Sequence, residues 1–337
     1  MTSHMRREIG EQPAAVAATL AEVAGPAAAL AAAVRARELD RVVLVARGTS
    51  DHVAIYARYL LEARCALSAS LAAPSLYTTY RPPVDLSRAL VLGVSQSGET
   101  PEIVAALDFA AGRGALTAAL TNEAGSPLAN AVGHALVTAA GAERSVAATK
   151  TFTTALAAIG ELTRELGASD LAAGLKALPG ALAAAEALPG ELVESSARAL
   201  LDSDAAVCIA RGYAYAIALE AALKLKEVAG LWAEGFSAAD LRHGPRAAAL
   251  GLPALVFHAG GPLAGDVDGL ERELAAAGSP IVSIGPGRAL RAAEGLCEEL
   301  APIALIVPAQ LVAERLAVLR GRDPDRPPGL TKVTRTH

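Results

Sequence analysis

The feature that most constrains the fold of this chain is an internal repeat. A short apolar run, an Arg-Gly pair and a helical stretch follow one another at residues 42–62 and again at 206–227. The two segments are related by a shift of 164 positions, as from Ala46 to Ala210. Three further pairs of apolar runs follow the same shift, the last only weakly: 89–94 with 254–257, 116–120 with 280–284, and 135–137 with 301–307. Self-similarity at a fixed period predicts two tandem copies of one unit, with a strand at each of these runs.

Each copy alternates short apolar runs with longer helical patterns. This alternation predicts an α/β fold in which a parallel sheet is flanked by helices on both faces. Ligands of such sheets bind beyond the carboxyl ends of the strands. In the first copy, residues 48–50 and 95–100 are predicted to lie there. The connection at 166–192 is rich in alanine and is expected to be helical.

The turn at 95–100 follows a predicted buried strand and precedes a predicted helix, so it lies where unpaired backbone N–H groups and the helix dipole favour an anion. Its side-chain donors are Ser95, Gln96, Ser97 and Thr100. Gly98 allows a ligand to approach the backbone. The turn lacks the lysine of a Walker loop, which disfavours a nucleoside triphosphate. A phosphate site is therefore one interpretation, and an ordinary helix cap at Ser97 is the other. The second copy has His-Ala-Gly-Gly at the corresponding place, so only the first keeps the turn.

Hydrophobic residues make up 53% of the 337 residues, but much of this content is alanine, and aromatic residues make up only 3%. Prolines and charges interrupt the apolar runs, so no membrane span is expected. The polar residues 8–12 stand where a signal peptide needs an apolar core, and a cytoplasmic protein is the expectation. A net charge of −5 with interspersed signs disfavours nucleic acid as a partner.

Neither a metal nor a redox cofactor is indicated by the sequence. The three cysteines, Cys65, Cys208 and Cys297, are far apart and lack metal-ligand spacing, so they are expected to be reduced and structural. The segment 285–290 only partly matches a dinucleotide-binding loop, because its last glycine is missing.

Three charged residues share one stripe of the predicted helix 215–230. Glu220, Lys224 and Glu227 are spaced by four and three positions, which places them on one helix face. A solvent-facing ion-pair stripe is the simplest interpretation. The alternative is a catalytic group, because this helix begins at the predicted ligand edge of the second sheet.

Other segments are ambiguous on composition alone. His243 is a single histidine before a helix stop, and such residues are more often structural than catalytic. The segment 143–151 precedes a helix and could simply cap it. The tail 323–332 lacks periodicity and is expected to be a loose terminus.

Together these segments resemble the double sugar-isomerase (SIS) domain family along nearly the whole chain. The matching segments agree in order and spacing and are Gln12–Pro13, Arg47–Ser50, Ser95–Thr100, Ser145–Lys150, Leu219–Glu227, Arg242–Pro245 and Asp323–Lys332. Residues 143–150 and 323–328 are most similar to SIS-type glucosamine-6-phosphate deaminases, relatives of the isomerase half of the amidotransferase that makes glucosamine 6-phosphate.

The resemblance implies two tandem SIS domains, each a flavodoxin-like three-layer sandwich around a parallel sheet. The implied division is an N-terminal helical segment at 1–30, a first SIS domain with the phosphosugar turn at 31–185, a second SIS domain with the catalytic helix at 190–322, and a tail at 323–337 that closes over the active site.

The resemblance also implies roles for individual residues. The implied substrate contacts are Thr49, Ser50, Ser95, Gln96, Ser97, Thr100 and Ala148. The implied catalytic residues are Glu227, which moves a proton between C1 and C2; Lys224 and His243, which assist ring opening; Glu220, a further carboxylate; and Lys332, which closes over the sugar. Because His243 would reach in from the neighbouring subunit, a homodimer is expected.

Three departures from the amidotransferase pattern bear on the substrate. No cysteine nucleophile follows Met1, so glutamine is not expected to be the nitrogen source. Ala148 replaces a serine of the amidotransferases, and Trp232 stands where the compared relatives have histidine. The identity of the amino sugar therefore stays open.

The resulting hypothesis is an isomerising deaminase that converts glucosamine 6-phosphate and water to fructose 6-phosphate and ammonia. Glu227 would shift the proton, and the carbonyl or imine would itself act as the electron sink, so no metal or cofactor is required. The alternatives are another phosphosugar isomerase, a deglycase, or a non-catalytic phosphosugar sensor.

Overall fold

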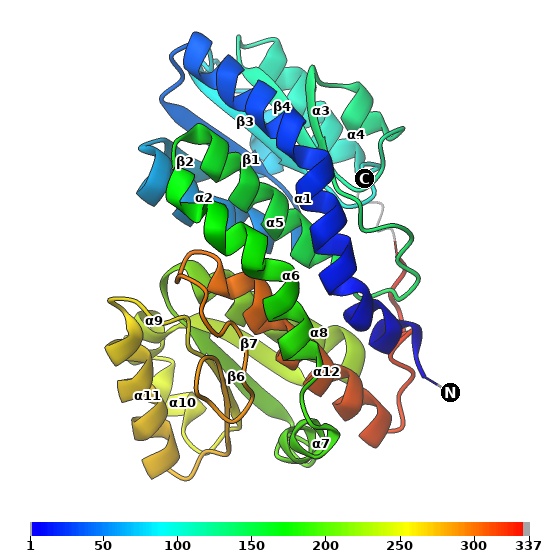
Figure 1. Ribbon diagram of the computed structural model, residues 1–337, viewed down its shortest axis with the longest axis vertical. Coiled ribbons are helices and arrows are strands. Elements are labelled where there is room, and N and C mark those ends of the chain that lie inside the picture. The colour runs from blue at the N-terminus through cyan, green and yellow to red at the C-terminus, as the bar shows by residue number, and fades with distance from the viewer. Residues whose placement is uncertain (1, 333–337) are drawn as a thin grey trace. The chain divides into compact units, whose positions relative to one another are not determined.

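The computed structural model describes residues 2–332, which form two compact units (Figure 1). The first unit comprises residues 14–142 and 150–175, and the second comprises residues 2–13, 143–149 and 176–332. Helix α1 (His4–Ala36) contributes residues to both. Each unit is built around one parallel sheet, which confirms the predicted α/β class.

The first unit contains a five-stranded sheet in the order β2-β1-β3-β4-β5. Its strands are β1 (Arg41–Val45), β2 (Ser68–Leu71), β3 (Ala89–Val94), β4 (Leu116–Thr121) and β5 (His134–Val137). All neighbouring strands are parallel, and Val45 pairs with Gly93 where β1 and β3 end. This is the flavodoxin-like order, and the strand order reverses between β1 and β3, where α/β sheets bind ligands.

Helices cover both faces of this sheet. The helical elements of this part of the chain are α2 (Thr49–Cys65), η1 (Leu76–Tyr80), α3 (Pro101–Ala111), α4 (Pro127–Asn130), α5 (Lys150–Leu166), η2 (Ser169–Leu171) and the start of α6 (Ala172–Glu186). One apolar core joins β1 and β3 to α3, α4 and η1. Helices α2 and α5 pack together on the other face (Figure 1). Every residue of β3 is buried, as expected for a strand covered on both faces.

The second unit repeats this plan with four parallel strands in the order β7-β6-β8-β9. The strands are β6 (Ala205–Ala210), β7 (Trp232–Ser237), β8 (Ala254–Phe257) and β9 (Ile281–Ile284). The helical elements are α7 (Gly190–Arg198), η3 (Gly212–Ala214), α8 (Tyr215–Ala229), α9 (Ala238–Arg242), α10 (Arg246–Ala249), α11 (Ala264–Ala276) and α12 (Ala301–Leu319). The strand order reverses between β6 and β8, so this sheet has an equivalent ligand edge.

Helices α9, α10 and α11 close an apolar core on one face of the second sheet. Helix α8 packs against β6 and β7 on the other face, and α12 packs against α8 (Figure 1). At Gly235 on β7 an added Cβ would lie 2.7 Å from the backbone of Leu219, so glycine permits the close approach of strand and helix. Helix α8 is therefore buried along most of its length.

The prediction of a strand at 301–307 is wrong, because these residues form the start of α12. The apolar pattern continues to Leu319, which is too long for a strand, and Pro302 lies in the first turn, where a helix tolerates proline. The second sheet consequently lacks a counterpart of β5 among the described residues.

By length and composition alone, two described helices, α1 and α12, could cross a membrane. The segments 169–186 and 190–198 meet the same criterion if this bent pair is counted as one span. The expectation that no segment meets this criterion is therefore wrong. Alanine keeps the hydropathy of both helices high while adding little bulk. In α12 most side chains are already buried within the protein, and this burial accounts for its apolar composition.

Candidate functional site

The turn at 95–100 lies at the carboxyl end of β3 and leads directly into α3. The Ser95 hydroxyl lies 3.2 Å from the Thr100 hydroxyl and accepts a hydrogen bond of 3.2 Å from the Gly98 N–H. The Ser97 hydroxyl accepts a hydrogen bond from the Glu99 N–H. Thr100, not Ser97, is the N-cap residue, and no described side chain caps the first turn of α3. This favours the anion site over the ordinary helix cap.

Contacts with the neighbouring strand hold the turn in shape. The Gln96 carbonyl accepts hydrogen bonds from the Asn122 N–H at 3.0 Å and from the Thr121 hydroxyl at 3.2 Å. Gly98 has a φ of 62°, and an added Cβ would lie 2.2 Å from the Ser126 hydroxyl. Glycine is required here both for its backbone conformation and for space. The hydroxyl donors are therefore positioned before any ligand arrives.

The turn that follows β1 lies beside the turn after β3 at this sheet edge. Gly48 has a φ of 57° and is the N-cap residue of α2, which begins with Thr49 and Ser50. Arg47 forms a two-pronged ion pair with Glu102 at the start of α3, at 2.9 and 3.1 Å. This pair ties the two loops together. The placement of Thr49 and Ser50 at the ligand edge agrees with the position expected from the sequence.

In the second unit, helix α8 brings together the three charged residues of the predicted stripe. The Lys224 Nζ lies 3.2 Å from a Glu220 oxygen and 2.5 Å from a Glu227 oxygen. The Glu220 and Lys224 side chains are 0% and 1% exposed, whereas that of Glu227 is 22% exposed. The stripe is buried between β6, β7 and α12, so the solvent-facing interpretation is wrong.

The electrostatics of this trio keep Lys224 charged. Burial alone would lower the pKa of Lys224, but the adjacent carboxylates of Glu220 and Glu227 outweigh burial and raise it above its ordinary value. An ammonium between two carboxylates leaves one negative charge in excess. Glu227 is the partly exposed carboxylate of the trio.

The segment 143–149 holds the end of the described chain. Lys332 Nζ lies 2.5 Å from a Glu143 oxygen, and the other Glu143 oxygen accepts hydrogen bonds from the backbone and hydroxyl of Thr149. Asp325 accepts hydrogen bonds from the N–H groups of His4 and Met5 at the start of α1. The prediction of a loose terminus is therefore wrong for residues 323–332, and residues 333–337 of the predicted tail lie outside the described residues.

Sequence reasoning missed the buried carboxylate of Glu8. It accepts hydrogen bonds from the N–H groups of Arg144 and Ser145, and burial raises its pKa. Glu8 thus supports the loop that carries Ala148, which is half-buried. In the sequence Glu8 is one acidic residue in a predicted helix, and this pattern does not predict a contact with residues 144 and 145.

Two residues singled out in the sequence lie on the surface of the second unit. His243 follows α9 and is exposed. Trp232 begins the edge strand β7, is 70% exposed and lies under the Lys226 ammonium, which is 5.9 Å from the ring centroid. Surface placement is compatible with contact to a second subunit, but within one chain neither side chain is part of the trio.

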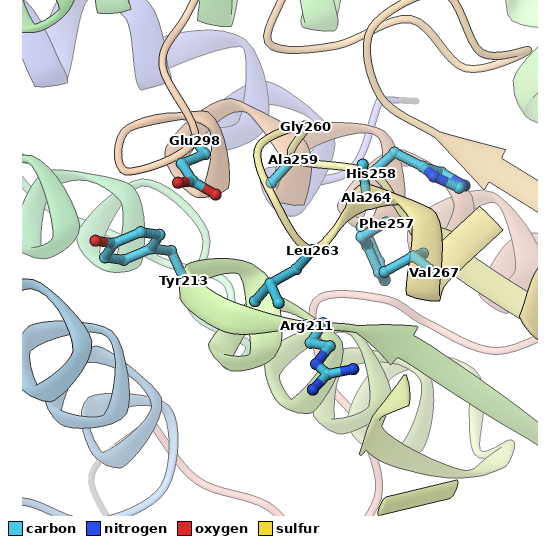
Figure 2. Close-up of a pocket in the computed structure, with 10 residues that line it drawn as sticks. All are labelled: Arg211, Tyr213, Phe257, His258, Ala259, Gly260, Leu263, Ala264, Val267 and Glu298. Carbon is cyan, nitrogen blue, oxygen red and sulfur yellow. The ribbon is translucent and has the colours of Figure 1, made fainter. Parts of the chain in front are cut away.

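The ligand edge of the second sheet carries a pocket of different composition (Figure 2). Its lining includes Arg211, Tyr213, His258, Ala259, Gly260 and Glu298. A shift of 164 positions relates Tyr213 to Thr49 and Ala259 to Ser95. The second unit therefore lacks a counterpart of the Ser95 hydroxyl at this position, whereas Tyr213 keeps a hydroxyl at the place of Thr49.

Comparison with known proteins decides the family. The SIS domain model matches residues 37–163 and 199–285. The chain belongs to the SIS domain family. Both matched stretches contain a sheet edge described above, and the second contains the α8 trio.

The relatives include an isomerizing aminotransferase and a solved structure of the same fold. Glutamine--fructose-6-phosphate aminotransferase (isomerizing) from Zymomonas mobilis is 34% identical over 97% of this chain. The chain spans 58% of the length of that relative. A crystal structure of a Silicibacter pomeroyi protein that carries the provisional name phosphosugar isomerase is 38% identical, with a TM-score of 0.87 over 96% of this chain and 100% of that one.

A further solved structure shares the fold. Glucosamine-6-phosphate deaminase from Thermotoga maritima has a TM-score of 0.80 over 99% of this chain and 100% of that one, at 23% identity. The prediction of tandem SIS-type sandwiches is thus confirmed at the level of fold.

Proposed function

We propose that this SIS protein is a phosphosugar isomerase that acts on glucosamine 6-phosphate and releases ammonia. The observation that carries the proposal is the buried Glu220–Lys224–Glu227 trio, whose excess carboxylate provides a base next to a fixed positive charge. The prepared hydroxyl turn at 95–100 supports a phosphorylated substrate.

The reaction begins with the open-chain aldehyde of the sugar. Glu227 removes the proton from C2, the C2–H electron pair becomes the C1–C2 double bond of an enolamine, and the aldehyde oxygen takes up a proton from water. Glu227 then returns its proton to C1 while the nitrogen loses a proton to water, which gives a C2 imine. Water adds to the imine carbon and the C–N bond breaks, so the products are fructose 6-phosphate and ammonia.

Lys224 acts by charge in this scheme. A raised pKa keeps the group as an ammonium, which cannot attack a carbonyl carbon to form an imine. The ammonium instead stabilises the negative charge that develops on the sugar oxygen during proton transfer. Glu220 holds the ammonium from the buried side and compensates its charge.

The remaining assignments follow from the resemblance and belong to the proposal. Ser95, Gln96, Ser97 and Thr100 hold the phosphate, and Thr49, Ser50 and Ala148 lie beside the sugar. Lys332 closes over the sugar from the tail. His243 assists ring opening in the active site of a second subunit, which makes the enzyme a homodimer.

Incubation of the purified full chain with glucosamine 6-phosphate tests the proposal. Ammonia and fructose 6-phosphate are measured in separate coupled assays, and equal amounts of both are expected. Glucosamine without phosphate is the control and should not react measurably, because the turn at 95–100 then has no anion to bind. Failure to release ammonia, together with turnover of another sugar phosphate, would reject this substrate.

A second candidate is an aldose–ketose isomerase that leaves the substrate nitrogen in place or uses a sugar without nitrogen. The likeness to the Silicibacter pomeroyi protein over the whole of that chain favours it. Proton NMR in D₂O separates the two functions. Exchange of the C2 proton of a sugar phosphate without ammonia release would support the isomerase.

A further inference from the structure

A second group of titratable side chains lies between the end of β8 and helix α11, and it consists of a buried histidine and two partly exposed carboxylates. His258 is 5% exposed, and its two ring nitrogens face two different carboxylates. Nδ1 lies 3.1 Å from an oxygen of Asp268, and Nε2 lies 2.9 Å from an oxygen of Glu271. Figure 2 shows the imidazole directed away from Tyr213 and Glu298, on the far side of the loop that follows β8.

The fold does not require charge at this place. The shift of 164 positions relates Asp268 and Glu271 on α11 to Val104 and Leu107 on α3 of the first unit. Both α3 residues are apolar and pack with the core of that unit, and Leu107 is 1% exposed. Carboxylates at these helix positions are therefore not required by the shared fold, and their contact with a buried histidine points to a further role.

The imidazole is not satisfied by its protein neighbours. A neutral imidazole has one N–H group, so it can donate to only one of the two carboxylates. Nε2 is buried and lies 2.9 Å from a Glu271 oxygen, but the contact lacks the alignment of a hydrogen bond. A lone pair directed at a carboxylate is repulsive unless a proton or a metal ion lies between the two atoms.

We propose that His258, Asp268 and Glu271 bind a divalent transition-metal ion such as Zn²⁺. One donor atom from each residue lies within 4.8 Å of the others. Donors of one Zn²⁺ at about 2.0–2.2 Å lie up to about 4.4 Å apart, so only small shifts are needed. One imidazole with two carboxylates suits Zn²⁺ or Mn²⁺ better than soft metals. The ion would link the end of β8 to α11.

Arg288 is the competitor of this ion. Its guanidinium contacts Asp268 and lies 3.6 Å from an oxygen of Glu271, so it supplies positive charge to the same carboxylates. Arg288 is one-third exposed and can turn outward when a metal ion binds. The proposal therefore predicts that removal of the Arg288 charge strengthens metal binding, whereas a purely structural ion network would only be weakened by it.

Titration calorimetry of the full chain with Zn²⁺ tests the site. One ion per chain is expected, with binding lost in His258→Gln and about tenfold tighter in Arg288→Gln. His134→Gln, on β5 of the first unit, is the control and should bind like the parent chain. The absorption spectrum of bound Co²⁺ should indicate nitrogen and oxygen ligands, not thiolate.

Circular dichroism establishes that each variant is folded. If His258→Gln does not fold, Asp268→Asn and Glu271→Gln replace it. The proposal is overturned if neither the parent chain nor Arg288→Gln binds Zn²⁺, or if binding survives loss of His258 or of both carboxylates, which would indicate adventitious surface binding.

Discussion

The two units use the same scaffold at the ligand edge of their sheets but place different chemistry on it. In the first unit Arg47 pairs with Glu102, and in the second Arg211 pairs with Asp266. The same shift of 164 positions relates both the two arginines and the two carboxylates. Gly48 and Gly212 follow the two arginines with φ values of 57° and 62°. The loops that end the first strand of each unit are therefore alike in backbone and in ion pairing.

The difference lies in the helices that follow these loops. Helix α8 buries Glu220 and Lys224, whereas the equivalent positions of α2 are Tyr56 and Leu60, both fully buried. Conversely, the hydroxyl turn of the first unit has become Ala-Gly in the second. The comparison teaches that one copy carries a hydroxyl-rich turn while the other carries a buried charged trio, so mutations in the two units are expected to have different effects.

The largest effect is expected for Glu227→Gln. Loss of the base should lower kcat by about 10²–10⁴-fold, while substrate binding persists because the turn at 95–100 is untouched. Glu234→Gln, an exposed position on β7, is the control and should be near the parent value. Steady-state kinetics and equilibrium binding provide the measurements. Equal loss of binding and turnover would show that Glu227 acts on binding and would weaken the division between the units.

Lys224→Met should cost about 3–5 kcal/mol of unfolding free energy, because two carboxylates would then be left without their buried counter-charge. Lys226→Met, at an exposed position of the same helix, should change stability by no more than about 0.5 kcal/mol. Urea denaturation compares the two variants. Similar stability of both would mean that the trio is not an electrostatic unit.

Ser95→Ala tests the role of the hydroxyl turn in the first unit. Removal of a hydrogen bond to a charged phosphate should cost about 1.5–3 kcal/mol of binding free energy and should appear mainly in KM. The matched change in the second unit, Ala259→Ser, should leave KM unchanged. An increase in KM from Ala259→Ser would indicate that the second edge also takes part in substrate binding.

The fold was largely predictable because its strands are short apolar runs in repeated order. The exception was 301–307, where an apolar run alone does not distinguish a buried helix from a strand. Helical spacing placed Glu220, Lys224 and Glu227 on one face. Their burial was not predictable, because it depends on packing of α8 against β7 and α12.

Contacts between residues far apart in the chain were also beyond sequence reasoning. Glu8 supports a loop 136 positions away, and Asp325 binds the start of α1. Neither contact leaves a local pattern. The offset of 164 positions could have drawn attention to Asp268 and Glu271, since carboxylates there replace the apolar Val104 and Leu107 of the other copy.

The smallest effects are expected at the paired arginines. Arg47 is half-exposed and Arg211 less so, so Arg47→Met should cost about 0.2–1 kcal/mol of stability and Arg211→Met somewhat more. For KM the order should be reversed, with a larger increase in Arg47→Met than in Arg211→Met. Glu102 lies in the first turn of α3 and, without Arg47, would repel a sugar phosphate at the adjacent turn. Asp266 has no such neighbour in the proposed mechanism. Urea denaturation and KM measured on both variants test this crossing of effects, and a larger KM for Arg211→Met would contradict the assignment of phosphate binding to the first unit.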